Sequence, residues 1–108
     1  MEIYELSQGE QFLIEVIRFF RFLRGIGYEY SGFDIGREPY VEFRNHRTSH
    51  KIMIIWEEYQ ELNVLFERKL FLGVKTTNLK EVISPKRPII SVKTLAELIQ
   101  SDYLHLVQ

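Results

Sequence analysis

The hydrophobic positions near the start of the chain recur at helical spacing. They follow Ser7 and Glu10, which form an S-x-x-E capping box, a common signature of a helix N-terminus. Gly25 and Gly27 offer left-handed backbone positions where a helix can stop. The pattern therefore predicts an amphipathic helix of about five turns over residues 8–24. Its apolar face comprises Phe12, Leu13, Val16, Ile17, Phe19, Phe20 and Leu23.

From Tyr28 the apolar positions recur every second residue, as they do in β-strands. The short stretches between these runs favour antiparallel neighbours and predict a four-stranded meander. Met53 and Ile55 also make the second face of the third run apolar, so we expect that strand in the middle of the sheet, covered on both faces or at a dimer contact. The runs are Tyr28 and Tyr30, Val41 and Phe43, Ile52 to Trp56, and Leu62 to Phe66.

Beyond Gly73 the pattern weakens, and we expect the sheet to be complete by then. Residues 78–83 are long enough for one or two helical turns, and the two prolines of residues 84–88 indicate a loop. Thr94 and Glu97 repeat the capping-box spacing and predict a short C-terminal helix over the sheet, with an apolar stripe of Leu95, Leu98, Ile99 and Tyr103. The whole chain, residues 1–108, is expected to form a single α+β domain.

The composition limits which classes of partner and which cellular compartment we expect for this chain. A formal net charge of −1 removes the general attraction to nucleic acid or an anionic membrane, so we expect neither as a partner. The chain has no cysteine, which fits a reducing compartment. The N-terminus lacks the layout of a signal peptide, and no apolar run approaches the roughly 18 residues that span a bilayer. We therefore expect a cytoplasmic protein whose mature chain is the whole chain.

Residues 44–50 gather imidazole, guanidinium and hydroxyl groups at one predicted turn, where they are suited to bind a phosphate. The triplet starting at His46 matches the H-x-T element of two-histidine phosphoesterases, but that chemistry needs two such elements, and His50 and His105 do not supply the second. As metal ligands, His46 and His50 would need to share one face of a helix, but they flank a predicted turn and have no matched carboxylate pair. A solvated polar hairpin turn is the favoured interpretation.

The sequence has no phosphate-binding loop, no dinucleotide fingerprint and no nucleophile elbow. We therefore expect no catalytic residues, no cofactor, no bound metal and no hydrolytic activity.

An acidic cluster surrounds the next predicted turn, with two aromatic residues beside it. Paired carboxylates can serve acid and base catalysis within a cleft, but nothing in the sequence indicates a cleft here. The cluster is either a solvated hairpin or a docking patch for a basic protein, with the aromatics as anchors and the carboxylates as steering charges. These candidate partner-binding residues are Trp56, Glu57, Glu58, Tyr59 and Glu61.

Phe22 breaks the pattern of the first helix, because its projected direction falls on the polar side. It is either buried under residues 85–88 or the C-terminal helix, or it is an exposed anchor for a partner or a homodimer. In the second case Arg18 and Arg21 would form a polar rim around it.

The helix ending at residues 22–28 and the strands at residues 40–43, 52–56 and 61–66 together resemble small bacterial immunity proteins of polymorphic toxin systems. The resemblance lies in the order of the elements over about residues 8–72. It implies a non-catalytic cytoplasmic protein that binds and neutralises a toxin domain, often through a charged surface that opposes the toxin's active site. Two other functions stay open: a homo-oligomeric structural or adaptor domain, and a small phosphate- or nucleotide-acting enzyme that uses His46 and His50.

Overall fold

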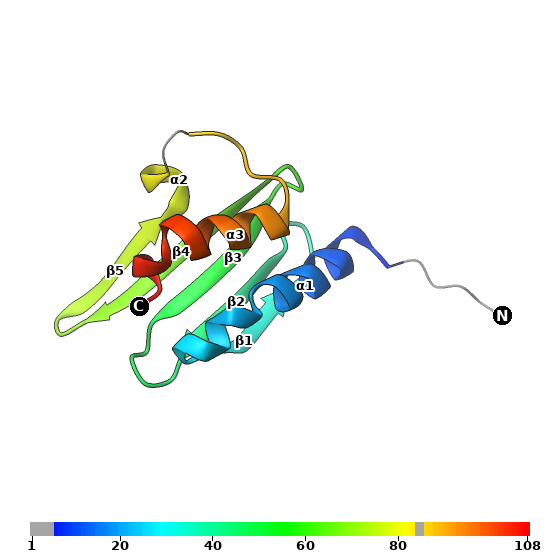
Figure 1. The fold of residues 1–108 in the computed structure, drawn as a ribbon. Helices are drawn as coiled ribbons and strands as arrows, with labels where there is room; N and C mark the ends of the chain where they lie inside the picture. The colour runs from blue at the N-terminus through cyan, green and yellow to red at the C-terminus, as the bar shows by residue number, and fades with distance from the viewer. Residues whose placement is uncertain (1–5, 84–85) are drawn as a thin grey trace.

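A computed structural model describes residues 6–83 and 86–108 and shows a five-stranded antiparallel sheet with helices packed on one face (Figure 1). Each strand pairs with the next in sequence, which confirms the meander. Within the described residues, no helix is long and apolar enough to cross a membrane. The strands are β1 (Tyr28–Asp34), β2 (Tyr40–Asn45), β3 (Lys51–Glu57), β4 (Glu61–Leu70) and β5 (Gly73–Asn78). The helices are α1 (Gln8–Phe19), α2 (Leu79–Val82) and α3 (Val92–Asp102), with 3₁₀ segments η1 (Arg21–Ile26) and η2 (Leu104–Leu106).

The α+β class, the antiparallel sheet and the two flanking helices are confirmed, but the predicted number of four strands was one too few. The missing strand is β5, which pairs with β4 from Leu70 opposite Gly73 to Leu65 opposite Asn78. Most of β5 is exposed at the edge of the sheet, so its side chains need not alternate between apolar and polar. Backbone pairing with β4, rather than a sequence period, defines this strand.

The start of α1 is as predicted, but its end is not. The hydroxyl of Ser7 accepts a hydrogen bond from the Glu10 amide at 3.2 Å, and the Glu10 carboxylate accepts one from the Ser7 amide at 3.2 Å. The α-helix stops at Phe19, and the chain continues through Phe20 as the tighter η1, which ends at Gly27 with φ 107°. Because a 3₁₀-helix has three residues per turn, an α-helical projection misplaces the side chains after Phe20.

The core lies between the sheet and the helix pair α1 and α3, which lie side by side over the same face (Figure 1). Helix α1 contributes Phe12, which stacks on Trp56 with ring centroids 5.7 Å apart, and helix α3 contributes the buried Leu95 and Ile99. Helix α3 begins one turn earlier than predicted, because the Ser91 hydroxyl, rather than Thr94, caps it. The predicted C-terminal helix over the sheet is confirmed, and only its start differs.

The other face of the sheet carries no helix layer among the described residues. Tyr40 lies opposite Ile55, and Met53 opposite Leu65, and these four side chains are only partly buried. Strand β3 is central in the sheet, as predicted for the apolar run that holds Met53 and Ile55. The second covering layer expected there is not present in the described part of the chain, and the dimer contact stays a prediction.

The segment between β5 and α3 contains one turn of helix, where one or two turns were predicted. Helix α2 follows Asn78, whose side chain accepts a hydrogen bond from the Lys80 amide at 3.0 Å. Of the loop predicted over residues 84–88, Ser84 and Pro85 lie outside the described residues. Of the contact predicted between Phe22 and residues 85–88, the part at Pro85 therefore lies outside the described residues.

Candidate functional site

The turn between β3 and β4 has an unusual backbone. Glu58 and Tyr59 have φ values of 50° and 57°, both in the left-handed region, and the Gln60 amide donates to the Glu57 carbonyl at 2.9 Å. Two left-handed residues in a tight hairpin are typical of a type I′ turn, which Asn and Gly normally occupy. A residue with a long side chain costs about 1 kcal/mol or more in this conformation. The surroundings must therefore hold the turn in place.

Tyr59 supplies the contacts that fix this turn. Its hydroxyl donates a hydrogen bond to the Gly36 carbonyl at 2.6 Å, which joins the turn to the loop between β1 and β2. Its ring lies against Trp56 with centroids 4.7 Å apart, and Trp56 in turn stacks on Phe12 of α1. Trp56 and Tyr59 are both partly buried. The predicted pair of aromatic anchors is therefore brought together and is continuous with the core.

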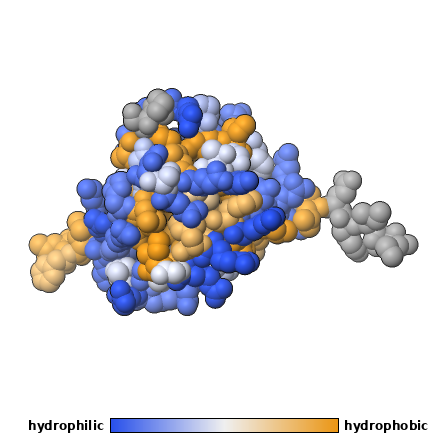
Figure 2. All heavy atoms as spheres, in the orientation of Figure 1, coloured by the Kyte–Doolittle hydropathy of each residue, from blue (hydrophilic) through white to orange (hydrophobic). Residues whose placement is uncertain are grey.

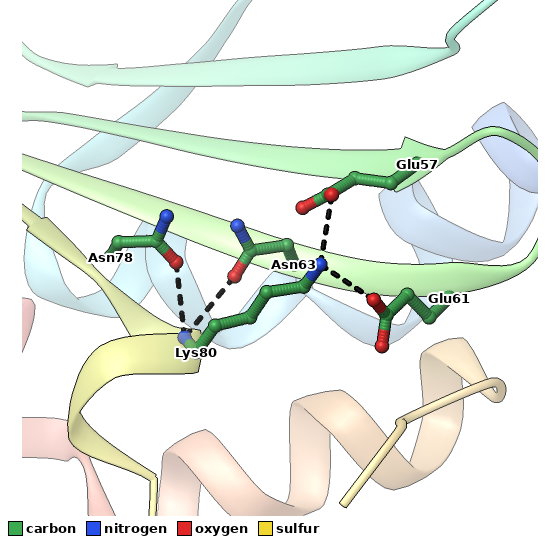
Figure 3. A network of polar contacts seen from close by, with 5 residues as sticks. All are labelled: Glu57, Glu61, Asn63, Asn78 and Lys80. Atoms are coloured by element: carbon green, nitrogen blue, oxygen red, sulfur yellow. Dashed lines mark hydrogen bonds and ion pairs between the residues drawn. The ribbon is translucent and has the colours of Figure 1, made fainter.

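Two of the three candidate glutamates share a cation that the sequence did not indicate (Figure 3). Lys80 Nζ lies 2.8 Å from Glu57 Oε2 and 2.6 Å from Glu61 Oε1. Glu57 and Glu61 are directly opposite in the sheet register, where two like charges destabilise the pair. Lys80 offsets this repulsion, and its hydrogen bonds to Glu57 and then Glu61 raise the pKa of its ammonium group.

Lys80 reaches the glutamates because two asparagines fix the start of α2 (Figure 3). The Lys80 amide donates to Asn78 Oδ1 at 3.0 Å and to Asn63 Oδ1 at 3.3 Å, and Asn63 is buried on the face of β4 opposite α1 and α3, beneath the start of α2. Lys80 is 23 residues from Glu57 and 19 from Glu61, so no local spacing could have revealed the contact. It depends on the unpredicted strand β5.

Glu58 is the one exposed member of the three glutamates, since Glu57 and Glu61 are partly buried against Lys80. A shallow hollow beside Glu58 is lined also by Tyr59, Glu38 and Arg37. Glu38, Glu57, Glu58 and Glu61 with Arg37 and Lys80 have a formal charge of −2, since −4 and +2 sum to −2, and the exposed Lys86 and Arg87 line a hollow at the Glu61 and Lys80 side of this region. We call it the acidic end, formed by Arg37, Glu38, Trp56, Glu57, Glu58, Tyr59, Glu61 and Lys80.

Phe22 and Arg18 contact aromatic residues other than those of the acidic end. Phe22 is partly buried and lies against Phe20 with centroids 5.7 Å apart, and the Arg18 guanidinium lies 5.3 Å from the centre of the Phe19 ring. The structure therefore places these two candidates on the surface of α1 and η1. The predicted polar rim of Arg18 around Phe22 stays a prediction.

The polar turn between β2 and β3 is organised by local hydrogen bonds. Asn45 Oδ1 accepts from the amides of Arg47 at 3.0 Å and Thr48 at 3.2 Å, and His46 Nε2 lies 3.4 Å from a Glu29 carboxylate oxygen. These contacts support the favoured interpretation of a solvated hairpin turn. In residues 6–83 and 86–108 no group of three or more His, Cys, Asp or Glu side chains is placed to hold a metal ion.

Comparisons with protein-family models, curated proteins and solved structures found no match to this chain. The assignment of a function therefore depends on the geometry of its own residues.

Proposed function

We propose that the chain is a non-catalytic protein-binding domain and that a protein partner docks on the acidic end. The observation that carries this proposal is the strained turn at Glu58 and Tyr59, which is held by a hydrogen bond to Gly36 and a stack on Trp56. Strained backbone persists only where its surroundings enforce it, and it concentrates at functional sites. A surface fixed before binding also loses less conformational entropy when it binds.

The residues of the acidic end have different roles in this proposal. Tyr59 is the contact anchor, because its ring is partly exposed and its position is fixed. Trp56 supports Tyr59 from behind, between that ring and Phe12. Glu58 and Glu38 are the exposed charges that steer a basic partner, whereas Glu57 and Glu61 act through their shared ion pair with Lys80. Phe22 and Arg18 are candidates for a second contact on α1 and η1.

From the resemblance to immunity proteins, we propose that the partner is a toxin domain with a basic active site and that the two proteins meet in the cytoplasm. An acidic surface that covers a basic active site both speeds association and blocks the substrate. The opposing charge of the acidic end supports this form of the proposal.

Co-expression tests the proposed function. Immunity genes lie beside the toxins they neutralise, so each product of the neighbouring genes is expressed alone and together with this chain. We expect one product to arrest growth alone, and the chain to bind it and restore growth. Glu58→Arg should weaken the rescue, whereas Glu97→Arg, which reverses an exposed charge on α3, should leave it intact. The immunity form is wrong if no neighbouring product is toxic or bound.

A homo-oligomeric adaptor is the second candidate, favoured by the sheet face that has no helix layer. Tyr40, Met53, Ile55 and Leu65 form adjacent apolar positions there. Light scattering distinguishes the two candidates, since the protein-binding proposal expects a monomer in the absence of its partner. A stable dimer that Met53→Glu dissociates would favour the adaptor.

A further inference from the structure

The hairpin of β4 and β5 ends in an exposed apolar tip. Its two turn residues, Phe71 and Leu72, are 100% and 93% exposed, and they lie between the paired Leu70 and Gly73. Leu70 and Val74 are about half exposed. Hydrophobic atoms project at the left end of the molecule, beyond its hydrophilic surface (Figure 2). Tight turns usually carry small or polar residues, so an exposed apolar turn of this kind is unusual.

Basic side chains surround the base of this tip. Arg68 lies opposite Lys75, and Lys69 lies opposite Val74. Because side chains alternate along a strand, Arg68 and Lys69 point to opposite faces of the hairpin. All three cations are exposed, the Arg68 guanidinium also donates a hydrogen bond to the Gln108 main-chain oxygen at 3.0 Å, and residues 68–75 include no acidic side chain. The tip therefore carries positive charge on both of its faces.

We propose that this hairpin tip inserts into the interface of an anionic phospholipid bilayer. Phe71 and Leu72 enter the boundary of the acyl chains, and the collar of Arg68, Lys69 and Lys75 contacts the phosphates of the headgroups. At about 3.3 Å per residue, the collar lies roughly 7–10 Å behind the end of the turn. This spacing matches the depth of about 5–10 Å to which interfacial apolar groups are buried.

A bilayer fits the shape and charge of the tip better than a protein groove does. The tip is a narrow convex projection with cations on both faces, and a fluid anionic surface can surround it from all sides. The near-neutral net charge predicted no membrane partner, but the charges are segregated along the molecule. The β3–β4 turn and the β4–β5 turn lie at opposite ends of β4, so a chain held by its tip keeps the acidic end away from the membrane.

Vesicle flotation tests this proposal with the full chain. At low ionic strength we expect it to float with vesicles of phosphatidylcholine containing about one third phosphatidylglycerol, and not with phosphatidylcholine alone; added salt should reverse the binding. Phe71→Ser with Leu72→Ser should reduce binding to the anionic vesicles about tenfold or more, as should Lys69→Gln with Lys75→Gln. Ile90→Ser and Lys93→Gln are matched controls, since both residues are exposed away from the tip.

Insertion depth gives a second readout. In a Phe71→Trp variant, lipids brominated on their acyl chains should quench the fluorescence of the introduced tryptophan. In the parent chain, the same lipids should not quench the single native tryptophan, Trp56. Melting temperatures should be unchanged in the tip variants, because the side chains of Phe71 and Leu72 are exposed. The proposal is overturned if the chain ignores anionic vesicles, if the serine variant binds them as the parent does, or if Phe71→Trp is not quenched. If the parent chain self-associates but does not bind vesicles, and the serine variant no longer self-associates, the tip contacts a second copy of the chain instead.

Discussion

At the scale of single residues, Glu58 and Tyr59 differ in how their left-handed conformations are compensated. Tyr59 has a hydrogen bond to Gly36 and a stack on Trp56. Glu58 has the same kind of backbone conformation, with φ 50°, but its side chain is exposed and makes no ion pair or hydrogen bond with the described residues. The strain at Glu58 is therefore not offset by contacts of its own side chain.

Glu58→Asn should stabilise the fold. Asn tolerates the left-handed region better than Glu, so the free energy of unfolding should rise by about 0.5–1 kcal/mol in a urea melt. Glu97→Asn is the control, because it removes an exposed glutamate from α3, where Asn is a slightly poorer helix former. If Glu58→Asn were no more stable than Glu97→Asn, the strain inferred at this turn would be refuted.

The residues of the acidic end illustrate how far sequence can predict a site. The pairing of Trp56 with Tyr59 beside the glutamates was predictable, because all of them belong to one hairpin. The ion pairs of Lys80 were not, because they depend on a strand and a helical turn far along the chain. A solvated turn would expose all three glutamates, but in the structure only Glu58 is exposed, and Glu57 and Glu61 are partly buried.

At the scale of elements, α1 is fitted closely to the loop between β1 and β2. Gly9, in the first turn of the helix, is buried, and a Cβ atom there would lie 2.8 Å from the Ile35 carbonyl oxygen. The neighbouring atom is backbone and cannot turn aside as a flexible side chain could. The glycine therefore allows α1 to approach the loop whose Gly36 carbonyl holds Tyr59.

Gly9→Ala should destabilise the fold by about 1–3 kcal/mol, since the added methyl group overpacks this contact. Helix propensity alone would make the same change stabilising by about 1 kcal/mol. Gly25→Ala in η1 is the matched control: a Cβ atom there meets nothing within 4 Å, so we expect it to be neutral or slightly stabilising. Chemical denaturation of both variants measures the difference, and a stabilising Gly9→Ala would contradict the close fit.

Most of the elements that sequence predicted have a period that burial produces. The start of α1 and the runs of β2, β3 and β4 are periodic because one face of each packs on the core, whereas β1, which was also predicted, buries only Tyr28. The end of α1 at Phe19 has no glycine or proline to signal it, and β5 is mostly exposed. Both follow from tertiary packing, which leaves no periodic trace in the sequence.

At the scale of the whole molecule, two surfaces of different chemistry lie at opposite ends of β4, and we propose each as a contact surface. The acidic end has a rigid turn and a formal charge of −2, from four carboxylates and two cations. The other end carries the apolar tip and its basic collar. The contribution of the β4–β5 hairpin to this separation of charge was not predicted from the sequence. A nearly neutral chain can therefore present two oppositely charged surfaces.

The association rate of the partner with the acidic end tests the central claim most directly. With the partner identified by co-expression, the rate constant is measured over a range of ionic strengths for the parent, for Glu38→Gln with Glu58→Gln, and for the control Glu97→Gln with Asp102→Asn. All four side chains are exposed, so both double variants should remain folded. The acidic-end variant should associate about three- to tenfold more slowly at low salt and show a flatter salt dependence, while the control matches the parent. If the acidic-end variant instead associated at the same rate as the control at every ionic strength, the acidic end would not be the docking surface.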